Sequence, residues 1–267
     1  FSEIGKLNMN TFGLRAYYRP TQFGRLSIEY HTTNEFRRGG NKFDLEPFET
    51  DITEQTKHVI NSGGLTYDLF WKEYKHKLSF YTSAQHVDRN SYYGAQQDPN
   101  AYGKTKDLTF VGGGMYVGNF DKVLFSPATF TAGLEYSHNN MHDIMAGYNR
   151  DLEQKVRIAS AFFQNEWKMN DFTLLAGFRL DDHNLIENLI FSPRVNLLYK
   201  PSDALQGRLT WSTGFRAPQA YDEDLHVTAV GGEGVLINLA DGLKPEKSNS
   251  FSGSVDLSGQ IGHFQTN

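Results

Sequence analysis

The sequence predicts an all-β protein, built as an antiparallel up-and-down meander, and three observations support this fold class. Aromatic residues make up 14% of the 267 residues and glycine occurs 25 times, although hydrophobic residues reach only 39%. Such a composition favours many twisted strands joined by turns. Many segments alternate apolar and polar residues, as strands do when one face is apolar and the other wet. Finally, the connections between these segments are alternately short and long.

Eleven strand candidates follow one another along the chain, and a twelfth begins near Ile261. No segment has a sustained 3.6-residue period with capping residues, so almost no helix is expected. The candidate strands are Thr11–Arg19, Gly24–Thr33, Gln55–Asp68, Lys75–Asp88, Asp107–Gly118, Ala128–Asn140, Gln154–Lys168, Phe172–His183, Ser192–Lys200, Leu205–Thr213 and Ser248–Ser258.

Alternation is clear in four of these strands. In the second, Leu26, Ile28 and Tyr30 alternate with polar residues. The other three carry the apolar rows Phe130–Ala132–Leu134–Tyr136, Leu174–Ala176–Phe178–Leu180 and Val195–Leu197–Tyr199. Only Leu175 interrupts the polar row of its strand. These strands are therefore expected to have one apolar and one wet face.

The connections are sorted by length. Short turns are expected at Pro20–Phe23, Leu69–Tyr74, Asn119–Pro127, Met169–Asp171 and Pro201–Ala204. Long polar loops are expected between them, at Asn34–Glu54, Arg89–Lys106, Met141–Glu153, Asn184–Phe191 and Gly214–Lys247. In a meander, every second connection lies at the same end of the sheet. Tight turns at one end and long loops at the other are typical of outer-membrane β-barrels.

Aromatic residues gather beside the short turns, at Tyr17, Tyr18, Phe70, Trp71, Phe120, Phe125, Trp167, Phe172 and Tyr199. Such a belt suits a membrane interface, although aromatic residues also close the ends of any β core. Trp211 and Tyr30 are expected at the opposite belt. No run of 18 apolar residues exists, which excludes a membrane-spanning helix but not a spanning strand of about 9–11 residues.

The last third of the chain contains motifs that resemble a known family. The segment Ser192–Pro201 is followed by Gly214, Phe215, Arg216, Ala217 and Pro218, and then by Leu243, Lys244, Pro245 and Glu246. In this order and spacing they resemble the barrel of TonB-dependent outer-membrane receptors. The segment Gln219–His226 is most similar to Bacteroidetes members. We interpret the nine motif residues as structural: Gly214 and Pro218 end a strand, and Lys244 to Glu246 lead into the next.

The resemblance implies a transmembrane barrel of 22 strands, filled by an N-terminal plug domain with a TonB box ahead of it. Residues 1–267 would then supply about 11–12 strands of the wall, as a fragment without the plug. The whole protein would be located in the outer membrane and would import a scarce nutrient such as a ferric siderophore, haem, cobalamin or a glycan. Its partners would be membrane lipid, the TonB complex through the plug, a small ligand at the external loops, and a surface lipoprotein.

The sequence offers little support for catalysis or for a cofactor. No HExxH pairing and no GxSxG motif occurs. The acidic cluster Asp222–Glu223–Asp224–His226 matches no known Ca²⁺ loop, and it is interpreted as a solvated loop. We also expect structural roles for Asp181, Asp182 and His183, and a solubility role for the acidic loop with Glu46, Glu49, Asp51 and Glu54. A net charge of −5 gives no reason to expect nucleic acid as a partner.

Two alternatives remain open at this point. The first is a self-contained barrel of about twelve strands, acting as a passive channel or a membrane-embedded enzyme, in which the first and last strands pair. The second is a soluble, sugar-binding β-sandwich, in which the apolar rows are buried between two stacked sheets.

Overall fold

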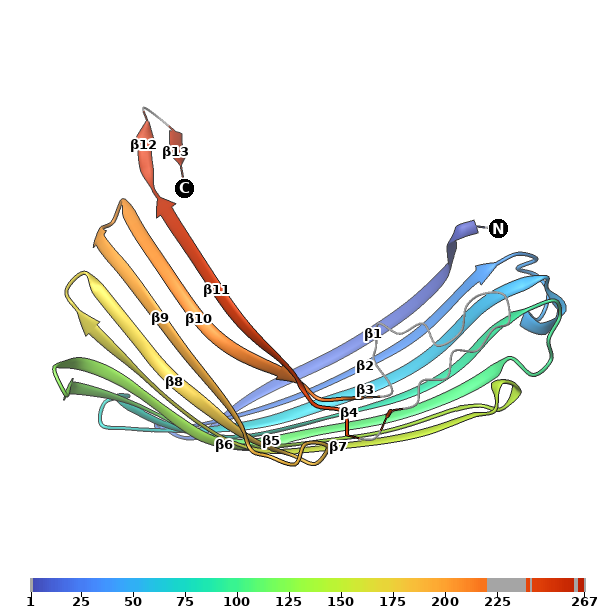
Figure 1. Cartoon of the computed structure of the whole chain (residues 1–267), viewed down its shortest axis with the longest axis horizontal. Helices are drawn as coiled ribbons and strands as arrows, with labels where there is room; N and C mark the ends of the chain where they lie inside the picture. The colour runs from blue at the N-terminus through green and yellow to red at the C-terminus, as the bar shows by residue number, and fades with distance from the viewer. Residues whose placement is uncertain (1, 220–238, 241, 262–263, 267) are drawn as a thin grey trace.

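The computed structural model describes residues 2–219, 239–240, 242–261 and 264–266. In these residues, eleven strands form one antiparallel sheet in which each strand pairs with its neighbours in chain order. Figure 1 shows that the sheet is strongly curved and open. Its strands are β1 (Ser2–Thr21), β2 (Gly24–Gly40), β3 (Ile52–Trp71), β4 (His76–Ala95), β5 (Tyr102–Val123), β6 (Ser126–Met145), β7 (Arg150–Met169), β8 (Phe172–His183), β9 (Ile190–Ser202), β10 (Leu205–Arg216) and β11 (Glu246–Leu257). The predicted meander is confirmed.

The connections sort to the two ends of the sheet. Tight turns occupy residues 22–23, 72–75, 124–125, 170–171 and 203–204 at one end, which we call the turn end. Residues 41–51, 96–101, 146–149, 184–189 and 217–245 connect strands at the other, the loop end. The prediction was wrong for Met141–Glu153, because β6 extends to Met145 and β7 begins at Arg150. The connection 146–149 is therefore as short as the turn 72–75. Two single-turn 3-10 helices, η1 (Pro47–Glu49) and η2 (Ala146–Tyr148), lie at the loop end.

One face of the sheet, called the outer face here, is apolar. The strand register places directly opposite one another the residues Tyr18, Leu26, Tyr67, Phe80, Gly114, Leu134, Ala161, Leu180 and Phe191. Large members of this row are open to the surroundings, with 65% of Tyr18 and 67% of Leu134 exposed. Exposed apolar side chains in a continuous row across nine strands fit contact with lipid.

The opposite, inner face is polar. Beside the apolar row, the register aligns Ser27, Thr66, Tyr81, Gly113, Glu135, Ser160 and Asp181. On this face Tyr81 of β4 reaches Glu135 of β6, and Glu135 reaches Arg179 of β8. Side chains of alternate strands, about 10 Å apart in the sheet, therefore converge. Such convergence identifies the inner face as the concave one.

The strands are longer than a bilayer requires. β3 has 20 residues, whereas a spanning strand needs about 9–11. Its outer-face apolar residues Leu65, Tyr67, Leu69 and Trp71 lie in the half next to the turn end. In the other half, mainly polar residues occupy the outer positions. The sheet therefore continues past the apolar band on the loop side by about 10 residues, or roughly 30 Å.

At the loop end, three connections pack into one small unit. Tyr92 and Ala101 are buried, with 1% and 0% exposed. The amide of Gln96 donates to the carbonyl of Asp51 at 2.8 Å, and the hydroxyl of Tyr148 donates to the carbonyl of Tyr93 at 2.7 Å. These contacts join the connections 41–51, 96–101 and 146–149, so these loops support one another.

A twelfth strand of the wall was expected to begin near Ile261, and the structure differs from this expectation. The short strands β12 (Gly259–Ile261) and β13 (Phe264–Thr266) pair with each other, outside the eleven-stranded sheet. The β-sandwich alternative is also wrong for the described residues, because no second sheet covers the apolar face there. A self-contained barrel would require β1 to pair with β11, and within the same residues these two strands do not pair. No helix among the described residues has the length and apolarity to cross a bilayer.

Candidate functional site

A row of polar residues crosses the inner face in the part of the sheet that extends past the apolar band. Glu35, His58, Arg89, Thr105 and Asp143 stand directly opposite one another on β2 to β6. We call this set the loop-end row. Because alternate residues of a strand share a face, a single register places all five side chains on the concave side.

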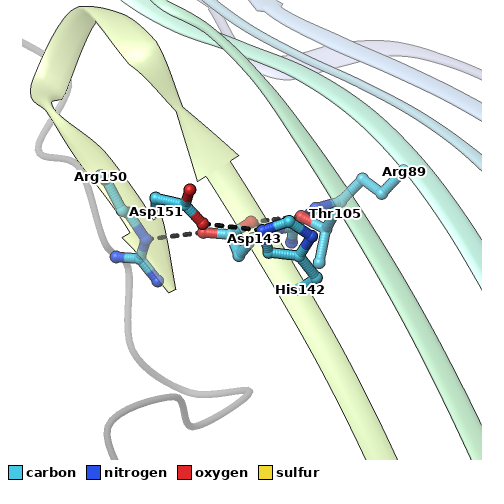
Figure 2. A network of polar contacts seen from close by, with 6 residues as sticks. All are labelled: Arg89, Thr105, His142, Asp143, Arg150 and Asp151. Atoms are coloured by element: carbon cyan, nitrogen blue, oxygen red, sulfur yellow. Dashed lines mark hydrogen bonds and ion pairs between the residues drawn. The ribbon is translucent and has the colours of Figure 1, made fainter. Parts of the chain in front are cut away.

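Asp143 is the centre of the loop-end row (Figure 2). Its side chain is buried, with the residue 1% exposed. Thr105 donates its hydroxyl hydrogen to Oδ1, Arg150 Nε lies 2.6 Å from Oδ2, and Arg89 Nη2 lies 3.4 Å from Oδ1. Arg89 also donates to the Thr105 hydroxyl, at 2.7 Å from Nη2. Two guanidinium groups thus meet one carboxylate.

The β2 end of the row holds a second charged group. Glu35 accepts from Arg37 Nε at 2.7 Å and lies 3.4 Å from Nδ1 of His58. Arg37 remains largely exposed, with 64% of its side chain accessible. From β2 to β7, the loop-end part of the inner face therefore presents arginines whose partners are carboxylates of the same wall.

A second network lies nearer the turn end. Arg179 donates to Glu135 at 2.9 Å, to Asp181 at 2.7 Å and to the Ser160 hydroxyl at 2.6 Å. Tyr81 donates to the other oxygen of Glu135 at 2.7 Å. The network links four strands, β4, β6, β7 and β8. Its role is to hold the curved wall together.

Gly113 allows this network to cross β5. A Cβ atom at this position would lie 2.6 Å from the hydroxyl oxygen of Tyr81 and 2.6 Å from the carbonyl oxygen of Leu134. Any side chain would therefore block the path of Tyr81 to Glu135. The glycine is needed for a close approach rather than for an unusual backbone angle.

The turn-end part of the inner face contains a shallow cavity of about 360 Å³. Arg194, Arg208, Glu166 and Asn196 contribute to its lining. Arg194 donates to Gln164 at 2.5 Å. The inner wall is thus polar along its whole height, as expected for a surface that faces water or a polar domain.

Two loop residues at the loop end have shifted pKa values. Hydrogen bonds from Lys42 Nζ and Asn41 Nδ2, both 2.9 Å long, hold the pKa of Asp51 below its ordinary value. Burial, with a smaller effect from Asp98, raises the pKa of Tyr148. At neutral pH, Asp51 is therefore an ionised acceptor, and Tyr148 keeps the proton that it donates to the carbonyl of Tyr93.

The motif residues lie on both sides of the 217–245 connection. Gly214, Phe215 and Arg216 end β10, and Ala217 and Pro218 follow that strand. Leu243, Lys244 and Pro245 precede β11, which begins at Glu246. Arg216 and Glu246 are directly opposite in the register of the two strands. The structural role assigned to the nine residues stays a prediction.

The acidic clusters have different positions. Asp222, Glu223, Asp224 and His226 lie outside the described residues. Asp181 takes part in the Arg179 network, whereas Asp182 projects to the other face of β8. Glu46 and Glu49 form a capping box around η1. Among the residues that the structure describes, no group of three or more acidic, histidine or cysteine residues is placed to hold a metal ion.

Comparison with known proteins gives the family. A family model described as TonB dependent receptor-like, beta-barrel, matches residues 4–267. The chain belongs to the TonB-dependent receptor barrels. No curated protein sequence matches it.

Solved structures share the fold of this receptor barrel. The siderophore receptor PirA from Pseudomonas aeruginosa superposes with a TM-score of 0.73 at 15% identity, over 94% of this chain and 43% of that one. The alcaligin outer membrane receptor FauA from Bordetella pertussis gives 0.68 at 12% identity, over 93% and 40%. The outer membrane transporter YddB from Escherichia coli gives 0.68 at 9% identity, over 95% and 38%. The chain spans less than half the length of each.

Family membership confirms the predicted location in the outer membrane. The apolar outer face of the receptor barrel is thus the lipid-contacting one. Outer-membrane barrels place tight turns on the periplasmic side and long loops outside. The loop-end row of the receptor barrel accordingly lies on the external side, above the lipid.

Sequence reasoning missed Arg89, Thr105, Asp143 and Arg150, because it assigned their segments to loops. One signal was present. Met141, Asp143 and Met145 continue the period of two from β6, and all three are buried. An alternation that continues past Asn140 indicates that the strand extends into the segment assigned to a loop.

Proposed function

We propose that this chain is part of the wall of an outer-membrane receptor for active, TonB-dependent uptake of a scarce nutrient, with a ferric siderophore as cargo. The observation that carries the proposal is the loop end of the inner face, a concave region above the lipid band on the external side where Arg37 is exposed and Arg89 is part-exposed. A ligand arriving from outside meets this surface first. Fold relatives described as siderophore receptors and as a ferric citrate transporter support the cargo class.

The chemistry of the row suits an anionic chelate. Arg37 is exposed, and the Asp143 centre combines two guanidinium groups with one carboxylate. Guanidinium groups form forked hydrogen bonds with carboxylates and are weakly hydrated, so they bind an anion at modest desolvation cost. The wall would attract the ligand, and the remainder of the binding site would come from elements beyond this chain.

The same proposal includes the rest of the receptor. The wall would continue to 22 strands around an N-terminal plug, and TonB would act on that plug to release the ligand. The proposal also takes the chain as a plug-lacking part of a Bacteroidetes-type receptor. A surface lipoprotein is a candidate partner of that receptor. Haem, cobalamin and a glycan are the alternative cargoes, which the uptake experiment separates from a siderophore.

Uptake by cells tests the proposal. Iron-limited cells that carry the complete receptor should accumulate a radioactive ferric siderophore from a panel of chelates, and a strain without TonB should bind the chelate without importing it. The double substitution R37Q/R89Q should weaken binding roughly 30-fold, because each lost cation removes roughly 1 kcal/mol of attraction at a partly exposed site. Equilibrium binding to purified receptor measures this.

Lys168→Gln is the matched control, since this lysine lies on the inner face near the turn end. It should bind the chelate like the unaltered receptor. Import of cobalamin or haem with no ferric chelate bound would contradict the siderophore cargo. TonB-independent import would contradict the mechanism itself.

A further inference from the structure

One stretch of β7 has a neighbouring strand on only one side. β7 begins at Arg150 and pairs with β6 from that residue onward. β8 has 12 residues and ends at His183, which lies opposite Ile158 of β7. Residues 150–157 therefore rise above the end of β8 by about 25 Å. We call this stretch the upper edge of β7, and it forms a step in the wall on the external side.

The direction of the backbone groups follows from the residue that closes the lower end of the edge. The backbone amide of Asn184 donates to the carbonyl of Arg157 at 3.1 Å, and its side-chain amide donates to the carbonyl of Lys155 at 2.9 Å. Arg157 and Lys155 thus direct their backbone groups away from β6. Because alternate residues of a strand share this direction, the N–H and C=O groups of Glu153 and Asp151 also point away from β6.

These backbone groups form an open edge. In the part of the chain that the structure describes, no strand, turn or loop pairs with the backbone of Asp151 or Glu153 on the side away from β6. Both side chains are accessible as well, with 75% of Asp151 and 54% of Glu153 exposed. An unpaired strand edge accepts an extended peptide as an additional strand.

The side chains of the edge determine which peptide is complementary to it. Asp151 and Glu153 lie on the outer face, and Leu152 and Val156 lie on the inner face, where Val156 is buried. The side chains of an added strand lie directly beside those of β7 on each face. Basic residues on its outer face would contact the two carboxylates, and apolar residues on its inner face would contact Leu152 and Val156.

The carboxylates can each accept a further donor. Nε2 of His142 lies 2.7 Å from Oδ1 of Asp151, and Nζ of Lys155 lies 2.6 Å from Oε1 of Glu153. The second oxygen of each carboxylate makes no ion pair with the residues that the structure describes. Since both oxygens of a carboxylate accept hydrogen bonds, a cation on the added strand can bind without displacing these partners.

We propose that the upper edge of β7 binds an extended segment of another protein as an added strand, antiparallel to β7. Its inner residues are apolar, and two successive outer residues beside Glu153 and Asp151 are basic. Beside Lys155, at the lower end of the edge, an acidic residue is complementary. Backbone hydrogen bonds supply affinity, and the alternate side chains supply specificity. The inference requires only that the edge lies outside the membrane, and it is independent of the cargo.

The test uses the complete receptor, purified in detergent, and a fluorescent, end-capped peptide with the sequence Val-Glu-Val-Lys-Val-Lys. Fluorescence anisotropy should show binding, and a peptide with lysine and glutamate exchanged should bind about tenfold or more weakly. D151N/E153Q should weaken binding of the first peptide roughly tenfold. The control D44N/E54Q removes two other exposed carboxylates at the loop end and should bind normally. Heat-modifiable electrophoresis checks that each variant is folded.

Backbone pairing has a separate signature in hydrogen exchange. Without peptide, the amides of Asp151, Glu153 and Lys155 should exchange fast, whereas those of Leu152 and Gln154, which are directed at β6, should exchange slowly. The peptide should protect the three fast amides, as mass spectrometry with residue-level fragmentation measures. E153P removes a free donor without removing a hydrogen bond to β6, and it should bind the peptide more weakly than E153Q.

Four results would overturn the proposal. The first is slow exchange of the Asp151 and Glu153 amides in the receptor alone, because the edge would then already be occupied. The second is equal affinity of D151N/E153Q and the unaltered receptor, and the third is equal affinity for the two peptides. The fourth is no binding of either peptide, in which case the charged side chains serve to keep the edge unpaired.

Discussion

At the scale of single residues, the inner wall depends on a few buried charges whose partners come from other strands. Asp143 illustrates this best, because Thr105, Arg89 and Arg150 approach it from three different strands. Removing one member of a buried pair leaves an uncompensated charge, which costs more than the pair contributes as a whole.

We expect Asp143→Ala to destabilise the barrel by about 3 kcal/mol, since the ion pair with Arg150, which is 6% exposed, would be lost. Asp143→Asn should cost less, because the amide oxygen still accepts a hydrogen bond. Urea titration followed by heat-modifiable electrophoresis measures both. Asp203→Ala breaks only the exposed pair with Lys200 and should leave the midpoint unchanged. An Asp143→Ala variant as stable as Asp203→Ala would refute a stabilising role for this centre.

At the scale of elements, the strands themselves extend beyond the bilayer. Sequence patterns predicted that Met141–Glu153 is a long polar loop. The strand ladder nevertheless continues to Met145 and Arg150. Hydrogen bonds between strands form with or without surrounding lipid. The ladder between neighbouring strands can therefore continue above the membrane.

Hydrogen exchange distinguishes the two descriptions. The amides of residues 141–144 should exchange slowly, on a scale of minutes to hours, because β6 is paired there with both β5 and β7. Amides in the connection 184–189 should exchange much faster and serve as the internal reference. Mass spectrometry of the receptor in lipid nanodiscs gives both rates. Fast exchange throughout 141–153 would mean that this segment is a loop after all.

At the scale of the whole molecule, the described sheet has two open edges, β1 and β11. β1 has 20 residues, with Leu14 61% exposed on its outer face. An exposed strand edge next to apolar surface promotes pairing with another chain. The curved sheet therefore needs further strands, or copies of itself, to satisfy its edges.

The chain produced alone should associate in detergent through β1. The sequence contains no cysteine, so Asn10→Cys on β1 reports this association as a disulfide-linked dimer in electrophoresis. Ser83→Cys, in the middle of the sheet on β4, is the control and should give no such dimer. A monomeric 30.3 kDa species without cross-links would show that the edges do not drive association.

The sequence by itself determined the meander, the sorting of turns and loops to opposite ends, and the family, because these depend on local alternation and turn residues and on the motif from Gly214 to Glu246. It also determined which residues of a strand share a face, such as Leu26, Ile28 and Tyr30. Only the tertiary structure decided that β6 and β7 continue above the membrane, that Gly113 clears a path for Tyr81, and that Asp143 meets two arginines. The physical reason is that cross-strand register and sheet curvature set which distant residues become neighbours, and no local pattern encodes either.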